Sequence, residues 1–413
     1  MNARADRFFL LDSLRGVAAL MVLATHVAFV LPVDSGARPY QARLEAAFAV
    51  FFVISGFLLY RPFVKARLLD QPALSVRAYG WRRFLRIVPA FWVAVTVIAL
   101  WIGVHDAFAP RNILANYGFL QLYRGENHAN VIPQAWTLCV EVAFYALLPV
   151  WAWLMRRAPG RDFDGRVRSE LVAVSLLVIG SLAWNAVLVY GDAVDRIPFA
   201  PTPILAALPG YMDHIGLGML LAVISVWIER RDRGLPRPLA FLAGHPALCV
   251  AIALAAIWAG ATRIGLTGAP SELYSPTQYM ERHVLNSVIA VAVVLPAIFG
   301  DSRQGLTRRV LGSPVLVYLG LISYGFYLFH LAVIDQLIEW KLYELDFLPP
   351  FLRWYLFALV GAVLLGSLSY YLVERPALSL KRLVPPRPRQ SRDEALAEPA
   401  PAAPVTAGSP PGG

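Results

Sequence analysis

Charge is scarce in this sequence, and apolar residues take its place. Only 15% of the 413 residues are charged and 58% are hydrophobic, whereas soluble domains are about a quarter charged and about half apolar. Apolar runs of about twenty residues recur along the chain, which is the length that a helix needs to cross a bilayer. The composition excludes an ordinary soluble protein. It predicts an all-α membrane protein, a polytopic bundle of about ten transmembrane helices.

Cysteine is nearly absent as well. Cys139 and Cys249 are the two cysteines of the chain, and both fall in apolar stretches without a partner at metal-ligand spacing. This pattern excludes a disulfide framework and gives no support to a zinc or iron–sulfur site. No metal cofactor is expected from the sequence.

The first apolar run is expected to be a retained span and not a cleavable leader. It extends over 12–31, is longer than the core of a signal peptide, and contains Arg15 and His26. The run at 247–262 is short and is the weakest candidate. The expected spans are 12–31, 44–62, 87–104, 134–155, 171–190, 204–228, 247–262, 283–300, 313–335 and 351–373.

Lys and Arg are distributed unevenly between the two sides of these spans. With the N-terminus inside, 28 of the 37 basic residues fall on the inner side. The bias follows the positive-inside rule, so we expect both termini to be cytoplasmic. The net charge of +10 is therefore a topology signal. Membrane lipid is an expected partner, and nucleic acid is not.

Hydrophobicity stops after the last span. The segment 385–413 is rich in Pro, Ala, Gly and Ser and has no apolar period, which is typical of disorder. We expect a transmembrane domain over 1–380 and a disordered cytoplasmic tail over 381–413. The loops are too short for another folded domain, so any chemistry must lie in the bundle.

Ionisable side chains within the spans are the candidate functional residues, because each costs several kcal/mol in hydrocarbon unless it is paired or wetted. Position along the spans places His26, Glu141 and His330 in one layer near the outer face. Asp213 and His214 lie somewhat deeper. They are candidates to line the outer side of a site, where the acceptor of a transferred group would enter. His330 also fits an interfacial anchor, and the last two also fit a polar pair lining a wet cavity. Four other histidines lie in loops or at span ends and are assigned no chemistry: His105, His128, His245 and His283.

A second layer, which is largely cationic, lies at the inner face. Arg15 begins the first span, and Arg83 and Arg86 precede the third. Arg15 and His26 are eleven residues apart, so they share a helix face within about 20° and are separated by roughly 16 Å. Guanidinium pairs suit phosphate, and coenzyme A carries its phosphates at one end and its thioester on an arm of comparable length. The arginines also fit the positive-inside rule without a ligand.

Six short segments in this order and spacing resemble those of a known family. They are Leu11-Asp12-Ser13-Leu14-Arg15-Gly16 running to His26, Phe51-Phe52-Val53-Ile54-Ser55-Gly56-Phe57-Leu58, Arg83-Phe84-Leu85-Arg86 before Pro89, Trp136-Thr137-Leu138-Cys139-Val140-Glu141 with Phe144-Tyr145, Ile322-Ser323-Tyr324-Gly325-Phe326-Tyr327-Leu328-Phe329-His330, and Glu374-Arg375-Pro376. On these segments, which span 11–376, the chain resembles the membrane acyltransferase-3 family, which includes bacterial O-antigen and macrolide O-acyltransferases.

The resemblance implies a ten-span protein of the cell inner membrane. Such a protein takes an acyl group, with acetyl the expected one, from cytoplasmic acyl-coenzyme A. It delivers that group to a hydroxyl, often of a sugar, at the outer side. In that family the residues matching Arg15 and His26 are needed for transfer, and the pair matching Arg83 and Arg86 is associated with coenzyme A. The family often has a second acidic residue where this chain has Val142, so no carboxylate pair is expected.

These observations lead to one main hypothesis. The chain is an O-acyltransferase with His26 as base or nucleophile, supported by Glu141, Arg15 and His330, and with a glycan, a glycolipid or a small molecule as acceptor. The alternative is a transporter or flippase of an acidic or glycolipid substrate, because charges within a membrane also mark permeation paths. A catalytically inactive binding subunit is a third interpretation. The oligomeric state is not indicated.

Overall fold

The chain is almost entirely helical where a computed structural model describes it, over residues 9–31, 36–124, 130–191, 197–198, 202–231, 234–265, 267–269, 272–300, 305–342 and 347–384. The long helices are α1 (Phe9–Val30), α3 (Ala47–Leu68), α4 (Val76–Trp101), α6 (Trp136–Arg157), α7 (Phe163–Tyr190), α9 (Leu208–Arg231), α11 (Pro246–Thr262), α12 (Pro276–Phe299), α14 (Pro314–Glu339) and α15 (Pro350–Ser369). The tail expected beyond residue 384 lies outside the described residues.

Short elements connect and extend the long helices. The short α-helices are α2 (Arg38–Ala42), α5 (Pro110–Tyr117), α8 (Pro203–Ala206), α10 (Arg237–Gly244), α13 (Leu306–Leu311) and α16 (Arg375–Ser379). The 3₁₀ turns are η1 (Arg43–Ala46), η2 (His105–Phe108), η3 (Gln121–Tyr123), η4 (Pro133–Ala135) and η7 (Leu380–Leu383), and a π-helical turn, η6 (Tyr370–Glu374), follows α15. Strands β1 (Ile197–Pro198) and β2 (Leu273–Tyr274) pair antiparallel, with Ile197 opposite Tyr274.

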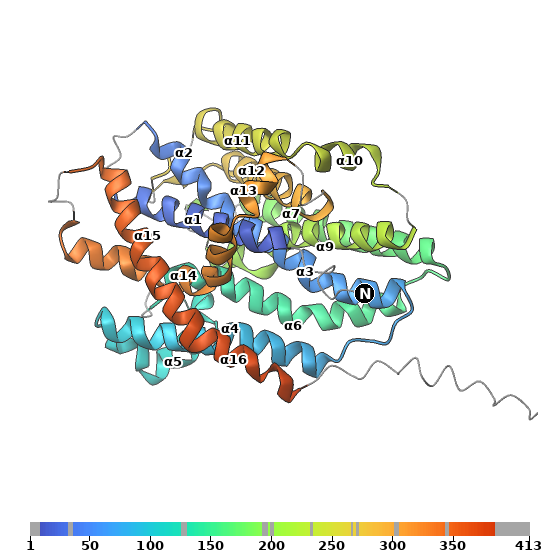
Figure 1. The fold of residues 1–413 in the computed structure, drawn as a ribbon, viewed down its shortest axis with the longest axis horizontal. Coiled ribbons are helices and arrows are strands. Elements are labelled where there is room, and N and C mark those ends of the chain that lie inside the picture. Colours follow the sequence, from blue (N-terminus) through green and yellow to red (C-terminus); the bar gives the residue numbers. More distant parts are fainter. Residues whose placement is uncertain are drawn as a thin grey trace, which may run out of the picture.

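The long helices form one bundle. Figure 1 shows α10 and α11 along one edge, α4, α5 and α6 along the opposite edge, and α15 crossing the bundle in front. The most extensive packing joins α3 to α9 and α1 to α14, with α14 also against α15 and α7 also against α9. Segments from both ends of the sequence therefore share the centre of the bundle.

The expected fold class is confirmed. Among the described residues, nine segments are long and apolar enough to cross a membrane. The pair α10 and α11 adds a tenth if it is one span, and its two helices are bent by 89° at their break. The weak candidate at 247–262 corresponds to α11 of this bent pair.

The third span begins earlier than expected. It was expected from 87, but α4 begins at Val76, because the side chain of Ser75 accepts a hydrogen bond from the backbone N–H of Ala78 and caps the helix. Arg83 and Arg86 therefore lie on the helix and not before it. Their side chains are fixed relative to the bundle.

The eighth span also begins earlier than expected. It was expected from 283, but α12 begins at Pro276, after a capping box in which Ser275 and Gln278 each bind the backbone of the other. His283 is therefore not at a span end. It lies about two turns inside α12, where its side chain is buried.

Glycines let the central helices approach closely. A Cβ at Gly56 of α3 would meet the carbonyl oxygen of Ile215 in α9, and a Cβ at Gly218 of α9 would meet the carbonyl oxygen of Val53 in α3. On α14, Gly320 lies in the same way against the backbone of α1. Small residues at crossings are how helices pack in lipid, where no hydrophobic force drives them together.

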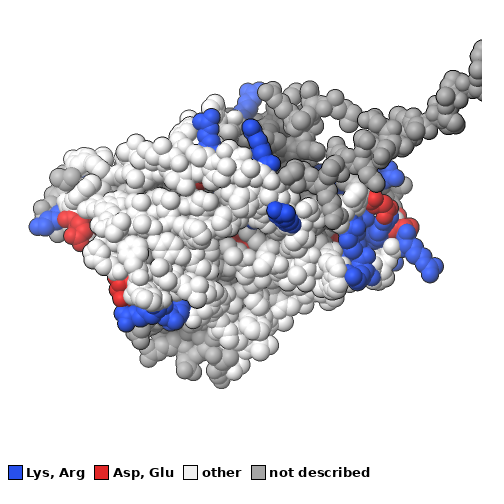
Figure 2. All heavy atoms as spheres, turned by 90° about the horizontal axis from the view of Figure 1, so that it is seen from below, with Lys and Arg blue, Asp and Glu red and all other residues white. Residues whose placement is uncertain are grey.

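The surface is apolar between charged ends. In the face drawn in Figure 2, Lys, Arg, Asp and Glu lie mainly at the ends and along one edge, and a broad uncharged surface separates them. Many large apolar side chains of the long helices are exposed, including Leu176, Val187, Val360 and Leu364. An exposed apolar belt of this kind matches a bilayer as solvent.

Adding a methyl group at the crossing of α3 and α9 tests this packing. We expect Gly56→Ala to destabilise the protein by about 1–3 kcal/mol, because the helices must move apart. The measurement is the thermal unfolding midpoint in detergent. Gly180→Ala is the matched control, since Gly180 lies within α7 and a Cβ there meets nothing within 4 Å. Equal midpoints for the two variants would contradict the close crossing.

Candidate active site

One cavity of about 750 Å³ runs through the centre of the bundle. Its wall includes Arg15 and His26 of α1, which confirms that these two residues share one face of the helix. The wall also includes Glu141 of α6 and both Arg83 and Arg86 of α4. The two expected layers, one cationic and one bearing His26 and Glu141, are therefore two parts of a single cavity.

The end of the cavity nearest Arg15 is basic. Arg82 and Lys381 line it together with Arg15, Arg83 and Arg86, and Lys381 is exposed. Two of the arginines lie near a carboxylate. Arg86 lies 3.3 Å from the buried carboxylate of Glu374, and Arg15 lies 3.7 Å from the half-buried carboxylate of Asp12. The π-helical turn η6 ends at Glu374, and such turns often occur at functional sites.

The carboxylate of Glu141 is held by two hydroxyl donors. Its Oε1 accepts a hydrogen bond from Ser55 Oγ of α3 and another from Tyr145 OH one turn along α6, both at 2.7 Å. Arg83 lies over the ring of Tyr145, with 5.9 Å between its guanidinium carbon and the ring centroid. These contacts connect the carboxylate with the cationic end of the cavity.

His26 and His330 form a pair of imidazoles whose tautomers follow from their partners. Nδ1 of His330 lies 2.7 Å from the carbonyl oxygen of Tyr327, which accepts only, so this nitrogen carries the proton and Nε2 is the acceptor. Nδ1 of His26 lies 3.0 Å from the carbonyl oxygen of Val22 and 3.1 Å from Nε2 of His330. The proton of neutral His26 is therefore on Nδ1.

This assignment leaves Nε2 of His26 with a lone pair. Since His26 lines the cavity, its Nε2 is the nitrogen that is available as a base or a nucleophile there. His330 is fully buried behind it and is not part of the cavity wall. Its place is that of a partner that orients the ring of His26.

Another part of the cavity wall carries an ion pair that the sequence analysis did not single out. Arg282 donates to both carboxylate oxygens of Glu45, at 2.6 and 2.7 Å. Arg282 also lies over the ring of Tyr274 in β2, and burial raises the pKa of this phenol, which therefore stays neutral. Aromatic rings of Phe48, Trp136 and Tyr211 pack against one another beside this pair.

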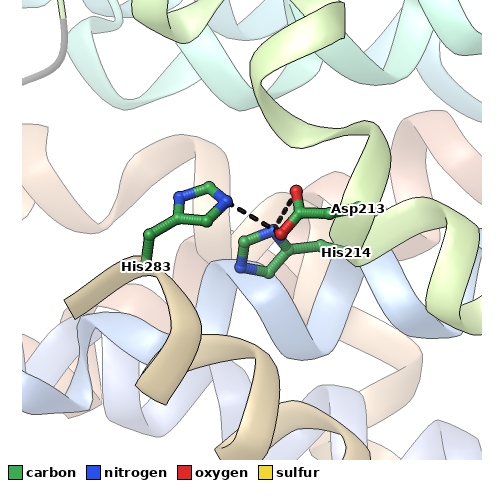
Figure 3. A group of neighbouring side chains, drawn as sticks. All are labelled: Asp213, His214 and His283. Atoms are coloured by element: carbon green, nitrogen blue, oxygen red, sulfur yellow. Dashed lines mark hydrogen bonds and ion pairs between the residues drawn. The ribbon is translucent and has the colours of Figure 1, made fainter. Parts of the chain in front are cut away.

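Asp213 and His214 lie close to the cavity but do not line it. Both are buried in α9 and hydrogen-bonded to one another, and Asp213 also contacts His283 of α12. Figure 3 shows the three side chains directed toward one another. Phe48 and Tyr211 are in ring contact with His214 and separate this cluster from the cavity.

Sequence reasoning missed several polar residues of the site. Ser55 and Tyr145 lie in segments that carried the family resemblance. Tyr145 is four residues after Glu141 on the same helix and its spacing could have indicated the contact, whereas the contact of Ser55 joins two helices and was not readable. Glu45 and Arg282 lie at span boundaries, where charges are common. His283 was set aside because the start of α12 was placed too late.

Comparison with known proteins identifies the family of the chain. A family model for an acyltransferase domain, that of the acyltransferase-3 family, matches residues 9–372. The chain belongs to the acyltransferase-3 family. It is a membrane acyltransferase, as its relatives are.

The relatives cover nearly the whole chain. Acyltransferase MdmB of Streptomyces mycarofaciens is 27% identical over 96% of this chain and 98% of its own length. Nodulation protein 10 of Rhizobium leguminosarum bv. viciae is 24% identical over 90% of this chain and 93% of its own length. The putative peptidoglycan O-acetyltransferase YrhL of Bacillus subtilis is 24% identical over 89% of this chain and 54% of its own length. No solved structure matches the chain.

The pairing of the two imidazoles predicts a specific phenotype for His330. We expect His330→Ala to lower kcat about tenfold or more with KM for the donor little changed, because the ring of His26 loses the partner that orients it. His330→Gln keeps an acceptor near the place of Nε2 and should restore part of the rate. His245→Ala is the control, since His245 is an exposed histidine at the break between α10 and α11. A loss equal for alanine and glutamine would contradict the positioning role.

Proposed function

We propose that this enzyme moves an acyl group, with acetyl the expected one, from cytoplasmic acyl-coenzyme A to a hydroxyl of a glycan, a glycolipid or a related acceptor at the outer side of the cell inner membrane. The observation that carries the proposal is that one cavity connects an arginine-lined inner end with Nε2 of His26. Two of its relatives are named as peptidoglycan O-acetyltransferases, one of them as a putative enzyme.

The acyl donor would enter the cavity at the end lined by arginines. Arg15, Arg83 and Arg86 offer forked donors to the phosphates of coenzyme A, and guanidinium pairs are well suited to phosphate. By helix rise, about 16 Å separates Arg15 from His26 along α1. The pantetheine arm is long enough to cover that distance and to place the thioester at His26.

The transfer step then follows from the tautomer of His26. Its Nε2 takes the proton of the acceptor hydroxyl while the hydroxyl oxygen forms a bond with the thioester carbonyl carbon. The carbon–sulfur bond breaks, and the imidazolium returns the proton to the departing thiolate. Glu141, held by Ser55 and Tyr145, orients the polar groups beside the reacting atoms and balances the positive charge of the cavity.

A covalent variant uses the same nitrogen. Nε2 of His26 forms a bond with the thioester carbonyl carbon, the carbon–sulfur bond breaks, and coenzyme A leaves as the thiolate. The acceptor hydroxyl then attacks the acyl-imidazolium, the carbon–nitrogen bond breaks, and the hydroxyl proton passes to water, which returns His26 to its neutral form. The two routes differ in whether an acylated enzyme exists before the acceptor arrives. Both require His26 Nε2 to be unprotonated when the thioester reaches it.

Removing the imidazole tests the proposal directly. His26→Gln should lower transfer from labelled acetyl-coenzyme A to a panel of glycans and glycolipids by at least about a hundredfold, since no base remains. The thermal midpoint of the variant checks that it is folded. Normal transfer by a folded variant would rule out both routes. Acid quenching of the wild-type enzyme with donor alone distinguishes them, because an acyl-histidine is trapped only in the covalent route.

The arginine-lined end predicts a defect in donor binding. We expect Arg83→Gln and Arg86→Gln each to weaken acetyl-coenzyme A binding about tenfold or more, because a charge-assisted hydrogen bond to phosphate is lost. Arg157→Gln is the matched control, since Arg157 is an exposed inner arginine stacked on Trp153, outside the cavity wall. The experiment is a binding titration on sealed vesicles of known orientation. Unchanged donor affinity, or binding from the outer side, would contradict the proposal.

A further inference from the structure

A buried cluster outside the cavity brings together three groups that ligate metals. His214 Nδ1 lies 2.9 Å from Oδ1 of Asp213, and His283 Nε2 lies 2.8 Å from its Oδ2. The three donor atoms all lie within 4.8 Å of one another. Figure 3 shows one carboxylate facing two imidazoles that come from different helices, α9 and α12. None of the three lines the cavity, and the reaction proposed above uses none of them.

The donor set has the chemistry of a zinc-class site. Two imidazoles and one carboxylate are a common ligand combination for Zn²⁺ and for related divalent transition metals. Hydroxyl groups surround the carboxylate as outer contacts. Ser181 Oγ of α7 lies 3.1 Å from Oδ1, and Ser287 Oγ of α12 lies 3.4 Å from Oδ2. Such outer contacts orient metal ligands.

The spacing is close to what an ion requires. Ligands bound at 2.0–2.1 Å to a tetrahedral ion are about 3.3 Å apart. The nitrogen–oxygen separations, 2.9 Å to Oδ1 and 2.8 Å to Oδ2, each involve a different oxygen of the carboxylate and are shorter than this value by about 0.5 Å. The two imidazoles must approach one another by up to roughly 1.5 Å. Small side-chain rotations within one cluster supply such a shift, because the ligands are on two helices that already contact each other.

A nearby positive charge would stabilise the buried carboxylate of the cluster. Asp213, His214 and His283 are at most 4% exposed, and a carboxylate in a membrane interior is costly without a cation. The neighbouring Arg282 donates from Nε and one Nη to Glu45. A divalent ion between the three ligands would neutralise the carboxylate without recruiting that guanidinium.

We propose that Asp213, His214 and His283 bind one divalent transition-metal ion of the zinc class, within the outer half of the bundle. The ion would tie α9 to α12 and, through Ser181, to α7. Tyr211 and Phe48, which contact His214 and line the cavity, would then be fixed from behind. The site is structural and lies next to the catalytic cavity, and it does not depend on which acyl acceptor the enzyme uses.

The direct test uses cobalt as a spectroscopic probe of the whole protein. Tag-free protein in detergent is stripped with chelator and titrated with Co²⁺ and then with Zn²⁺. We expect one equivalent of Co²⁺ to give the visible absorption of a four-coordinate histidine and carboxylate site, and Zn²⁺ to displace it. Saturating Zn²⁺ should raise the thermal midpoint by about 5 °C. No absorption and no shift in the wild-type protein would overturn the proposal.

Matched variants identify the ligands. His283→Gln should abolish the cobalt absorption and the zinc-dependent shift, whereas His245→Gln, which changes an exposed histidine elsewhere in the bundle, should keep both. Ser287→Ala is a second, milder variant that leaves all three ligands in place, and it should weaken metal affinity about tenfold. Retention of the absorption in a folded His283→Gln protein would show that the metal binds elsewhere and would also overturn the proposal.

Discussion

The cost of holding charge inside a membrane determines how this protein is built. Arg15, Arg83, Arg86 and Glu141 lie on helices long enough to cross the bilayer, and isolated charges at such depth cost several kcal/mol each. The bundle meets this cost by directing all of them into one cavity of about 750 Å³, where they face water, partners or one another. The close crossings at glycine on α3, α9 and α14 keep the helices around that cavity in fixed places. The cavity in which we propose that transfer takes place is therefore also the feature that lowers the cost of these charges in the membrane.

Within this cavity, charge and proton chemistry are separated along α1. Cations gather near Arg15, where the proposed polyanionic donor would be held by its far end, and the pair of His26 and His330 lies further along the helix. Two backbone carbonyls, those of Val22 and Tyr327, determine which ring nitrogen carries a proton. Backbone carbonyls cannot titrate, so this control is insensitive to the charges nearby. The arrangement gives a base whose free nitrogen is defined before any substrate arrives.

The sequence predicted the fold class and the number of spans better than it predicted helix starts. Of the candidate site residues, Arg15, His26, Arg83, Arg86 and Glu141 line the cavity, whereas His330, Asp213 and His214 do not. Hydropathy reports where apolar residues are dense, so it placed the third span at 87 and missed that a Ser75 cap begins α4 at Val76. The helical period was enough to put Arg15 and His26 on one face, because both residues belong to one uninterrupted helix. Contacts between helices, such as Ser55 with Glu141 or Arg282 with Glu45, depend on how helices rotate about their axes. Hydropathy carries little of that information.

Because hydropathy does not report helix rotation, the depth of a residue along its span could not distinguish residues that line the cavity from residues buried behind its wall. Asp213 and His214 were expected near the outer side because they lie in a span at suitable depth, and His283 was assigned no chemistry because its helix was thought to begin there. In the structure these three meet behind the cavity wall, on faces of α9 and α12 that turn toward each other. An ionisable residue in a membrane helix needs a partner, but the partner is either substrate and water or another side chain. Only the rotation of each helix decides between the two, and here it directs His26 to the cavity and His214 away from it.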